Sequence, residues 1–84
     1  MKESRHFKEV VMYEYGDFFV EITVSHDDYE AWIRHKDYGV AQLMFGIPKY
    51  EDGNHTKSYG QFKEIVIKNL DEYIELYREE YMND

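Results

Sequence analysis

The stretch FFVEITVS, residues 18–25, decides the fold. Apolar and polar side chains alternate along it without a break, and this period of two is typical of a β-strand with one buried face. One face carries Phe18, Val20, Ile22 and Val24, and the other carries Phe19, Glu21, Thr23 and Ser25. We expect the first face to line the core, because all of its side chains are apolar.

A second strand is predicted just before it, at residues 7–15. Gly16-Asp17 separates the two strands, and glycine takes the positive φ angle that a two-residue hairpin turn requires. A loop this short fixes the pairing, with Tyr15 opposite Phe18. The two strands should therefore form an antiparallel hairpin.

Residues 29–36 and 40–47 are predicted to form a second hairpin. Gly39 ends the short segment between them and suits the left-handed position of a three-residue loop. In each segment one set of alternate side chains is apolar, so each has one face suited to the core. These sets are Tyr29, Ala31 and Ile33 in the first segment and Leu43, Phe45 and Ile47 in the second.

The pairing of the second hairpin assigns its side chains to faces. Centred on Tyr38, it sets Ile33 opposite Leu43 on the core face and Trp32 opposite Met44 on the other face. A tight turn near residues 26 and 27 pairs the second strand with the third so that the apolar faces of the two hairpins lie on the same side of the sheet. We therefore predict an antiparallel meander in the order 1-2-3-4.

A helix should follow the sheet. Pro48 ends the fourth strand, and residues 48–58 are predicted as a surface loop. Ser58 and Gln61 have the spacing of a capping box, and apolar residues then recur every three or four positions to about residue 82. The predicted fold class is α+β: the meander with one helix, residues 59–82, packed on one face.

The whole chain, residues 1–84, is predicted to be a single domain, with residues 1–6 flexible. Its core should combine the apolar faces of the strands and the helix. The predicted core residues are Val11, Tyr13, Phe18, Val20, Ile22, Ile33, Leu43, Phe45, Phe62, Val66, Leu70, Tyr73 and Tyr77.

The composition restricts the classes of function. The net charge of −8 does not favour binding to nucleic acid or to an anionic membrane. The chain has no cysteine, which excludes disulfides and thiolate metal sites and fits a reducing, cytoplasmic location. No apolar run is long enough for a signal peptide or a membrane span. We expect a cytoplasmic protein that binds neither nucleic acid nor membranes directly.

No arrangement of residues indicates catalysis. Ser25 and His26 are neighbours, so on a strand they would point to opposite faces and not act together as nucleophile and base. The histidines at positions 6, 26, 35 and 55 lack the spacing of a zinc site and are expected to be solvated. The acidic turns at residues 26–28 and 51–54 lack the ligand series of a calcium loop. We predict no enzyme activity, no catalytic residue, no cofactor and no metal site.

The sheet face opposite the helix is the first candidate binding surface. A single helix covers one face of a sheet, so the other face should expose its apolar side chains. Aromatic residues and Met are enriched at the centres of protein interfaces. We therefore predict a protein-interaction surface that mediates self-association, most simply as a homodimer, with the interface residues Met12, Phe19, Trp32, Arg34 and Met44.

A second candidate surface is the acidic end of the helix. It carries Asp71, Glu72, Glu75, Glu79 and Glu80. Carboxylates at a helix C-terminus face the negative end of the helix dipole, so their presence there is electrostatically unfavourable. The alternative hypothesis is an acidic inhibitor that imitates nucleic-acid phosphates and blocks a DNA- or RNA-handling enzyme, as in the anti-restriction and anti-CRISPR proteins of phages and mobile elements. That comparison rests on charge and length.

Overall fold

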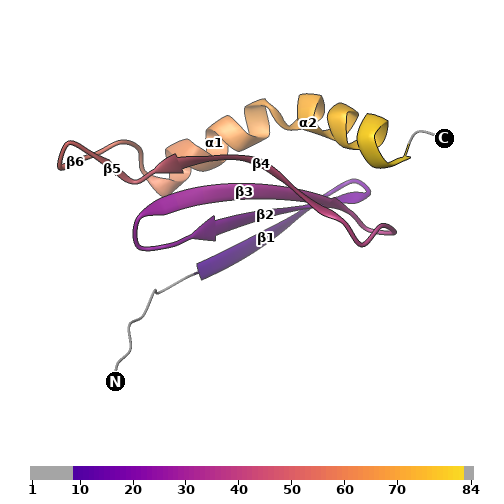
Figure 1. The fold of residues 1–84 in the computed structure, drawn as a ribbon, viewed down its shortest axis with the longest axis horizontal. Helices are drawn as coiled ribbons and strands as arrows, with labels where there is room; N and C mark the ends of the chain where they lie inside the picture. The colour runs from indigo at the N-terminus through magenta and orange to yellow at the C-terminus, as the bar shows by residue number, and fades with distance from the viewer. Residues whose placement is uncertain (1–8, 83–84) are drawn as a thin grey trace, which may run out of the picture.

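The computed structural model describes residues 9–82 and contains a four-stranded antiparallel sheet (Figure 1). Its strands are β1 (Glu9–Tyr15), β2 (Phe18–Val24), β3 (Asp28–His35) and β4 (Ala41–Pro48), in the order β1-β2-β3-β4. The predicted meander is confirmed. The predicted start of the first strand at residues 7 and 8, and the predicted flexibility of residues 1–6, lie outside the described residues.

The first three strands pair in the predicted register. Tyr15 lies opposite Phe18 on β1 and β2, and Ile22 lies opposite Ala31 on β2 and β3. Gly16 opens the first turn with a φ of +62°, which an L side chain adopts only with strain. The turn therefore sets the register of this hairpin as the sequence predicts.

The pairing of β3 with β4 differs from the prediction because β4 contains a bulge. Ala31 lies opposite Phe45, but Trp32 lies opposite Leu43, so Met44 is an extra residue. A bulge turns two consecutive side chains toward one face. Met44 is buried, with 6% of its surface exposed, and Phe45 packs against the same core. The predicted positions of Leu43 in the core and Met44 on the opposite face are therefore wrong.

The chain runs close to β3 just after the bulge. A Cβ added at Gly46 would lie 3.0 Å from the carbonyl oxygen of Tyr29, so a side chain there would force the strands apart. Leu43, on the other side of the bulge, takes the position next to Trp32 and is 42% exposed. The bulge thus exchanges the two neighbouring apolar residues between the faces of the sheet.

The connection between β3 and β4 is longer than predicted and spans residues 36–40. His35 holds this loop: its carbonyl oxygen accepts from the Tyr38 N–H at 3.2 Å, and its Nδ1 accepts from the Asp37 N–H at 3.0 Å. Among the glycines in the described chain, positive φ angles occur at Gly16 and Gly53. The prediction of a left-handed Gly39 is therefore wrong.

The predicted loop at residues 48–58 contains a short hairpin, β5 (Tyr50–Glu51) and β6 (Asn54–His55). Asp52 and Gly53 between them have φ angles of 53° and 81°, as a type I′ turn requires. The acidic residues of this segment thus belong to a tight turn.

Two helices and a π-helical turn take the place of the single predicted helix. α1 (Tyr59–Lys68) and α2 (Leu70–Tyr77) meet at Asn69, and η1 (Arg78–Met82) continues α2. Asn69 has a φ of −103° and a ψ of 6°, and its Nδ2 donates to the carbonyl oxygen of Ile65 at 2.8 Å. A side chain that bonds to a backbone carbonyl one turn earlier competes with helix geometry, so the break falls at this residue.

Both helices lie on one face of the sheet (Figure 1). α1 begins with the predicted capping box: Ser58 Oγ accepts from the Gln61 N–H at 3.2 Å, and Gln61 Oε1 accepts from the Ser58 N–H at 2.9 Å. In the described part of the chain, no helix has the length and apolar character needed to cross a membrane.

Aromatic rings join the helices to the sheet. Phe62 stacks on Tyr29 with ring centroids 5.1 Å apart, and Tyr77 meets Phe18 edge to face at 5.4 Å. The predicted core residues that are buried are Phe18, Val20, Ile22, Ile33, Phe62, Val66, Leu70 and Tyr77. Those that are half-buried are Val11, Tyr13, Phe45 and Tyr73.

One histidine belongs to this core. His35 is 7% exposed, and its ring meets Phe18 edge to face at 4.9 Å. The expectation that His35 is solvated is therefore wrong, because its side-chain position on β3 falls on the apolar face. His26 and His55 are exposed as predicted, and His6 lies outside the described residues.

Candidate functional site

The sheet face opposite the helices, here called the open face, is the candidate site. The strand pairing arranges its side chains in rows that cross all four strands. The central row contains Met12, Glu21, Trp32 and Leu43. The rows beside it contain Val10, Thr23, Glu30 and Gly46 on one side, and Glu14, Phe19, Arg34 and Ala41 on the other. Four of the five predicted interface residues therefore share this face.

Apolar side chains dominate the central row. Met12 is 47% exposed and Leu43 is 42% exposed, while Trp32 between them is half-buried by its neighbours. Trp32 Nε1 donates to Glu30 Oε1 at 3.3 Å, which orients the indole along its own strand. Met44, the fifth predicted interface residue, is in the core, so Leu43 takes its place beside Trp32.

Phe19 anchors the basic end of the open face. The Arg34 guanidinium carbon lies 4.9 Å from the centroid of the Phe19 ring, and Lys36 Nζ lies 5.5 Å from it. Lys36 also forms an ion pair with Glu14 across the sheet. Phe19 and Arg34 are paired across β2 and β3, so the guanidinium packs against the aromatic ring of the neighbouring strand.

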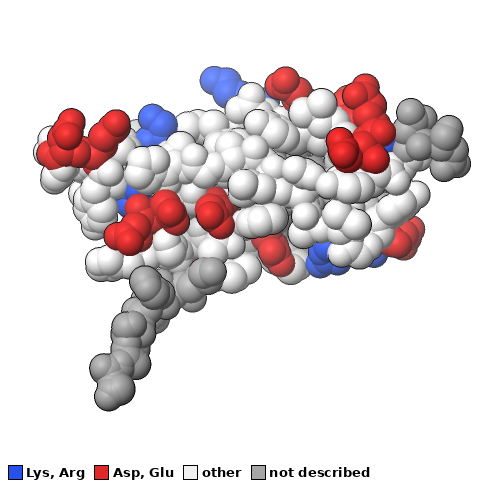
Figure 2. All heavy atoms as spheres, viewed as in Figure 1, with Lys and Arg blue, Asp and Glu red and all other residues white. Residues whose placement is uncertain are grey.

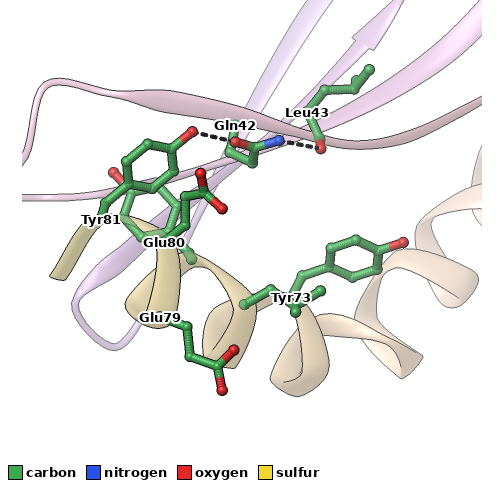
Figure 3. Close-up of a pocket in the computed structure, with 8 residues that line it drawn as sticks. Gln42, Leu43, Tyr73, Glu79, Glu80 and Tyr81 are labelled. Carbon is green, nitrogen blue, oxygen red and sulfur yellow. Dashed lines mark hydrogen bonds between the residues drawn. The ribbon is translucent and has the colours of Figure 1, made fainter. Parts of the chain in front are cut away.

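A groove runs between β4 and the C-terminal helical segments, with a volume of about 380 Å³ (Figure 3). The Tyr81 hydroxyl donates to Gln42 Oε1 across it, and the Glu79 carboxylate points away from the strand. Deeper in the same region, the Tyr77 hydroxyl donates to the Val40 carbonyl oxygen at 2.6 Å. These bonds tie η1 and α2 to the edge of the sheet, so we assign the groove a structural role.

The five predicted acidic residues are all exposed on α2 and η1. Asp71 and Glu72 lie in the first turn of α2, because the helix breaks at Asn69. Carboxylates in a first helical turn face the positive end of the dipole and are stabilising, so these two groups are not electrostatically unfavourable. Acidic side chains are prominent at both ends of the visible surface, and further charged groups lie along its upper and lower edges (Figure 2).

Ser25 and His26 lie in the turn between β2 and β3. Ser25 Oγ donates to Asp28 Oδ1 at 2.7 Å and accepts from the Asp28 N–H at 3.1 Å, which closes the turn between β2 and β3. His26 beside it is exposed. Within residues 9–82, no three His, Asp or Glu side chains come together to hold a metal ion.

A tyrosine pair carries the large pKa shift of the described residues. The hydroxyls of Tyr13 on β1 and Tyr59 on α1 lie 2.6 Å apart. Burial raises the pKa of Tyr59 above its ordinary value, and the hydrogen bond to Tyr13 and the negative charges of Tyr13 and Glu9 raise it further. Tyr59 therefore keeps its proton at physiological pH, and the hydrogen bond between the two hydroxyls joins the helix layer to the edge strand.

Sequence reasoning missed one residue of the open face, Leu43. Gly46 could have indicated the bulge that exposes Leu43, since a glycine inside a predicted strand often marks a bulge or a close approach of two backbones.

Comparison with known proteins gives no match to a family model, to a curated protein or to a solved structure.

Proposed function

We propose that this protein is a non-catalytic protein-interaction module whose open face binds another protein chain. The observation that supports this proposal is that three of the four side chains in the central row, Met12, Trp32 and Leu43, are apolar on a sheet whose helices both lie on the other side. Trp and Met side chains are enriched at the centres of protein interfaces, and here Met12 is exposed and Trp32 half-buried beside it on the same face. The simplest partner is a second copy of the chain, related by a two-fold axis. The absence of cysteine fits such a module in a reducing, cytoplasmic location.

The size of the open face sets the expected strength of binding. Four strands about 4.8 Å apart, each with about seven residues at ~3.4 Å, cover roughly 450 Å². Two such faces bury about 900 Å² together, which is slightly below the roughly 1,000 Å² expected of a stable interface and lies in the range of weak, transient contacts. We therefore expect weak, reversible association, with a dissociation constant between about 1 μM and 1 mM.

Sedimentation velocity over a range of concentrations tests the proposal. The wild type should sediment faster as its concentration rises, and Trp32→Ala should weaken the association by about tenfold or more, as for a central interface residue. Ile67→Ala is the matched control, because Ile67 is an exposed apolar residue on α1, on the opposite side of the sheet. It should leave the association unchanged.

A partner other than a second copy is tested with the same variants. If the wild type remains monomeric, wild type and Trp32→Ala are compared in a pulldown from the native host, and a partner held by the open face is lost from Trp32→Ala alone. Equal recovery of every partner by both proteins, together with a monomeric wild type, would refute the proposal.

An acidic inhibitor that imitates nucleic acid is the second candidate function. The observation in its favour is the exposure of five carboxylates on α2 and η1, none of which forms an ion pair within residues 9–82. Binding through these groups would weaken steeply with salt and would not depend on Trp32. Replacing the five carboxylates with amides separates the two functions. Loss of a partner from that variant alone, and not from Trp32→Ala, favours the inhibitor.

A further inference from the structure

We infer that the open face pairs with a second copy about a two-fold axis that crosses the strands at Trp32, so that Glu30 of each copy faces Arg34 of the other. This inference rests on the proposed function and names its partner and orientation. It follows from the order of charges along the central strand β3.

Every second residue of β3 points to the open face, and the charges of these residues change sign at Trp32. Asp28 and Glu30 precede Trp32, and Arg34 and then Lys36, just after the strand, follow it. When a second copy of the strand lies over the first in the opposite direction, each acidic residue therefore faces a basic residue at the same distance from Trp32. Such a pattern is complementary to its own reversed copy, which is the requirement for a two-fold interface.

The geometry of sheet packing permits this arrangement. Two sheets pack face to face about 10 Å apart, with strands aligned within about 30°. An axis perpendicular to the strands places β3 of one copy antiparallel over β3 of the other, with the two Trp32 side chains at the centre. Glu30 and Arg34 each lie two residues from Trp32, about 7 Å along the strand, so they meet across the interface.

The other simple orientation is unfavourable. An axis parallel to the strands that also passes over β3 would place β3 over β3 in the same direction, with Arg34 facing Arg34 and Glu30 facing Glu30. Like charges placed opposite each other in an interface oppose association strongly. The charge order of β3 thus selects one of the two orientations.

Arg34 and Glu30 are placed to form this contact. The ion pair of residues 9–82 joins Lys36 and Glu14 and involves neither of them. The guanidinium of Arg34 lies against the Phe19 ring, and Glu30 accepts from the Trp32 indole through Oε1. Glu30 has a second carboxylate oxygen, and a guanidinium binds a carboxylate through two parallel hydrogen bonds.

The same orientation has an unfavourable consequence at Glu21. Glu21 lies in the row of Trp32, so the two copies bring their Glu21 carboxylates opposite each other. This repulsion weakens the dimer at neutral pH. Glu21→Gln should therefore tighten the association severalfold. If Glu21 faced solvent in the dimer, the strength of association would not change, and if it faced a base, the association would weaken.

Charge reversal in separate chains tests the orientation. Glu30→Arg in one chain makes the β3 pattern basic on both sides of Trp32, and Arg34→Glu in another chain makes it acidic. Each variant alone should self-associate at least about tenfold more weakly than the wild type. An equimolar mixture should recover an association at least as strong as that of the wild type, because both contacts in the mixed dimer join opposite charges. Glu64→Arg and Lys68→Glu, exposed on α1, are the charge-matched controls.

The outcomes separate this inference from the proposed function. If the wild type associates and Trp32→Ala does not, but the mixture associates no better than its two components, the open face is the interface and the orientation is wrong. If the wild type shows no self-association up to about 1 mM, the inference fails, and the proposed function then depends on a different protein partner. If the Glu64→Arg and Lys68→Glu mixture behaves like the Glu30→Arg and Arg34→Glu mixture, net charge explains the effect and the inference also fails.

Discussion

Replacing Met44 and Leu43 separately with alanine tests the bulge on β4, which determines the composition of both sheet faces. Met44 is 6% exposed and packs in the core, so Met44→Ala leaves a cavity and should lower the free energy of unfolding by about 2 to 5 kcal/mol. Leu43 is 42% exposed, and Leu43→Ala should change it by no more than about 0.5 kcal/mol. A regular pairing without the bulge predicts the opposite order.

Urea denaturation followed by far-UV circular dichroism measures both effects. At a slope of about 1 kcal/mol per molar urea, Met44→Ala should move the midpoint down by about 2 M or more. For a domain of this length the total stability is roughly 4 to 12 kcal/mol, so the shift is large. The protein concentration stays low, since Leu43 also belongs to the proposed interface. A larger loss for Leu43→Ala than for Met44→Ala would refute the bulge.

Three further predictions concern single residues, each measured by urea denaturation. The pKa of Tyr59 is raised in the folded state, so the unfolded chain loses this proton first as the pH passes about 10. The contribution of Tyr59 to the free energy of unfolding is therefore complete below that pH and falls above it. Between about pH 9 and 11, the free energy of unfolding should fall less for Tyr59→Phe than for the wild type. Gly16→Ala should lower the free energy of unfolding by about 1 kcal/mol, because φ is positive at Gly16. Gly39→Ala should leave it unchanged or raise it slightly, and equal effects of the two substitutions would contradict the turn geometry. Ser58→Ala should lose about 1 kcal/mol through the capping box, and an unchanged midpoint would contradict it.

The first three strands were predictable because each had one register compatible with burial. A shift of β2 by one residue would expose Phe18 and Ile22 and bury Glu21, which is strongly unfavourable. The Gly16 turn fixes the same register independently. Local turn chemistry and the hydrophobic pattern therefore agree, and the structure follows both.

The register of β4 was not predictable from its own pattern. Leu43, Met44 and Phe45 are three consecutive apolar residues, so either of the first two can enter the core while the other lies beside Trp32. The two registers bury similar apolar groups, and the choice depends on how the strand packs against the helices and on the close approach at Gly46.

The helix break was hidden for a related reason. The apolar spacing of three and four residues continues through Asn69, so the pattern predicts one continuous helix. The break depends on a hydrogen bond from the Asn69 side chain to Ile65, which periodicity does not report. The candidate site was predictable on β1, β2 and β3, where the register was fixed, and these strands carry Met12, Phe19, Trp32 and Arg34. The prediction was wrong for Met44, which lies at the bulge of β4.

The fluorescence of Trp32 provides the most direct test of the proposed function. It is the single tryptophan of the chain and lies at the centre of the open face, so its emission reports on that face alone. Acrylamide quenching is measured across a dilution series from about 1 mM to about 1 μM. The account predicts that Trp32 is protected at high concentration and becomes more accessible on dilution, in parallel with dissociation seen by sedimentation. Dissociation of an oligomer with no change in Trp32 quenching would contradict it.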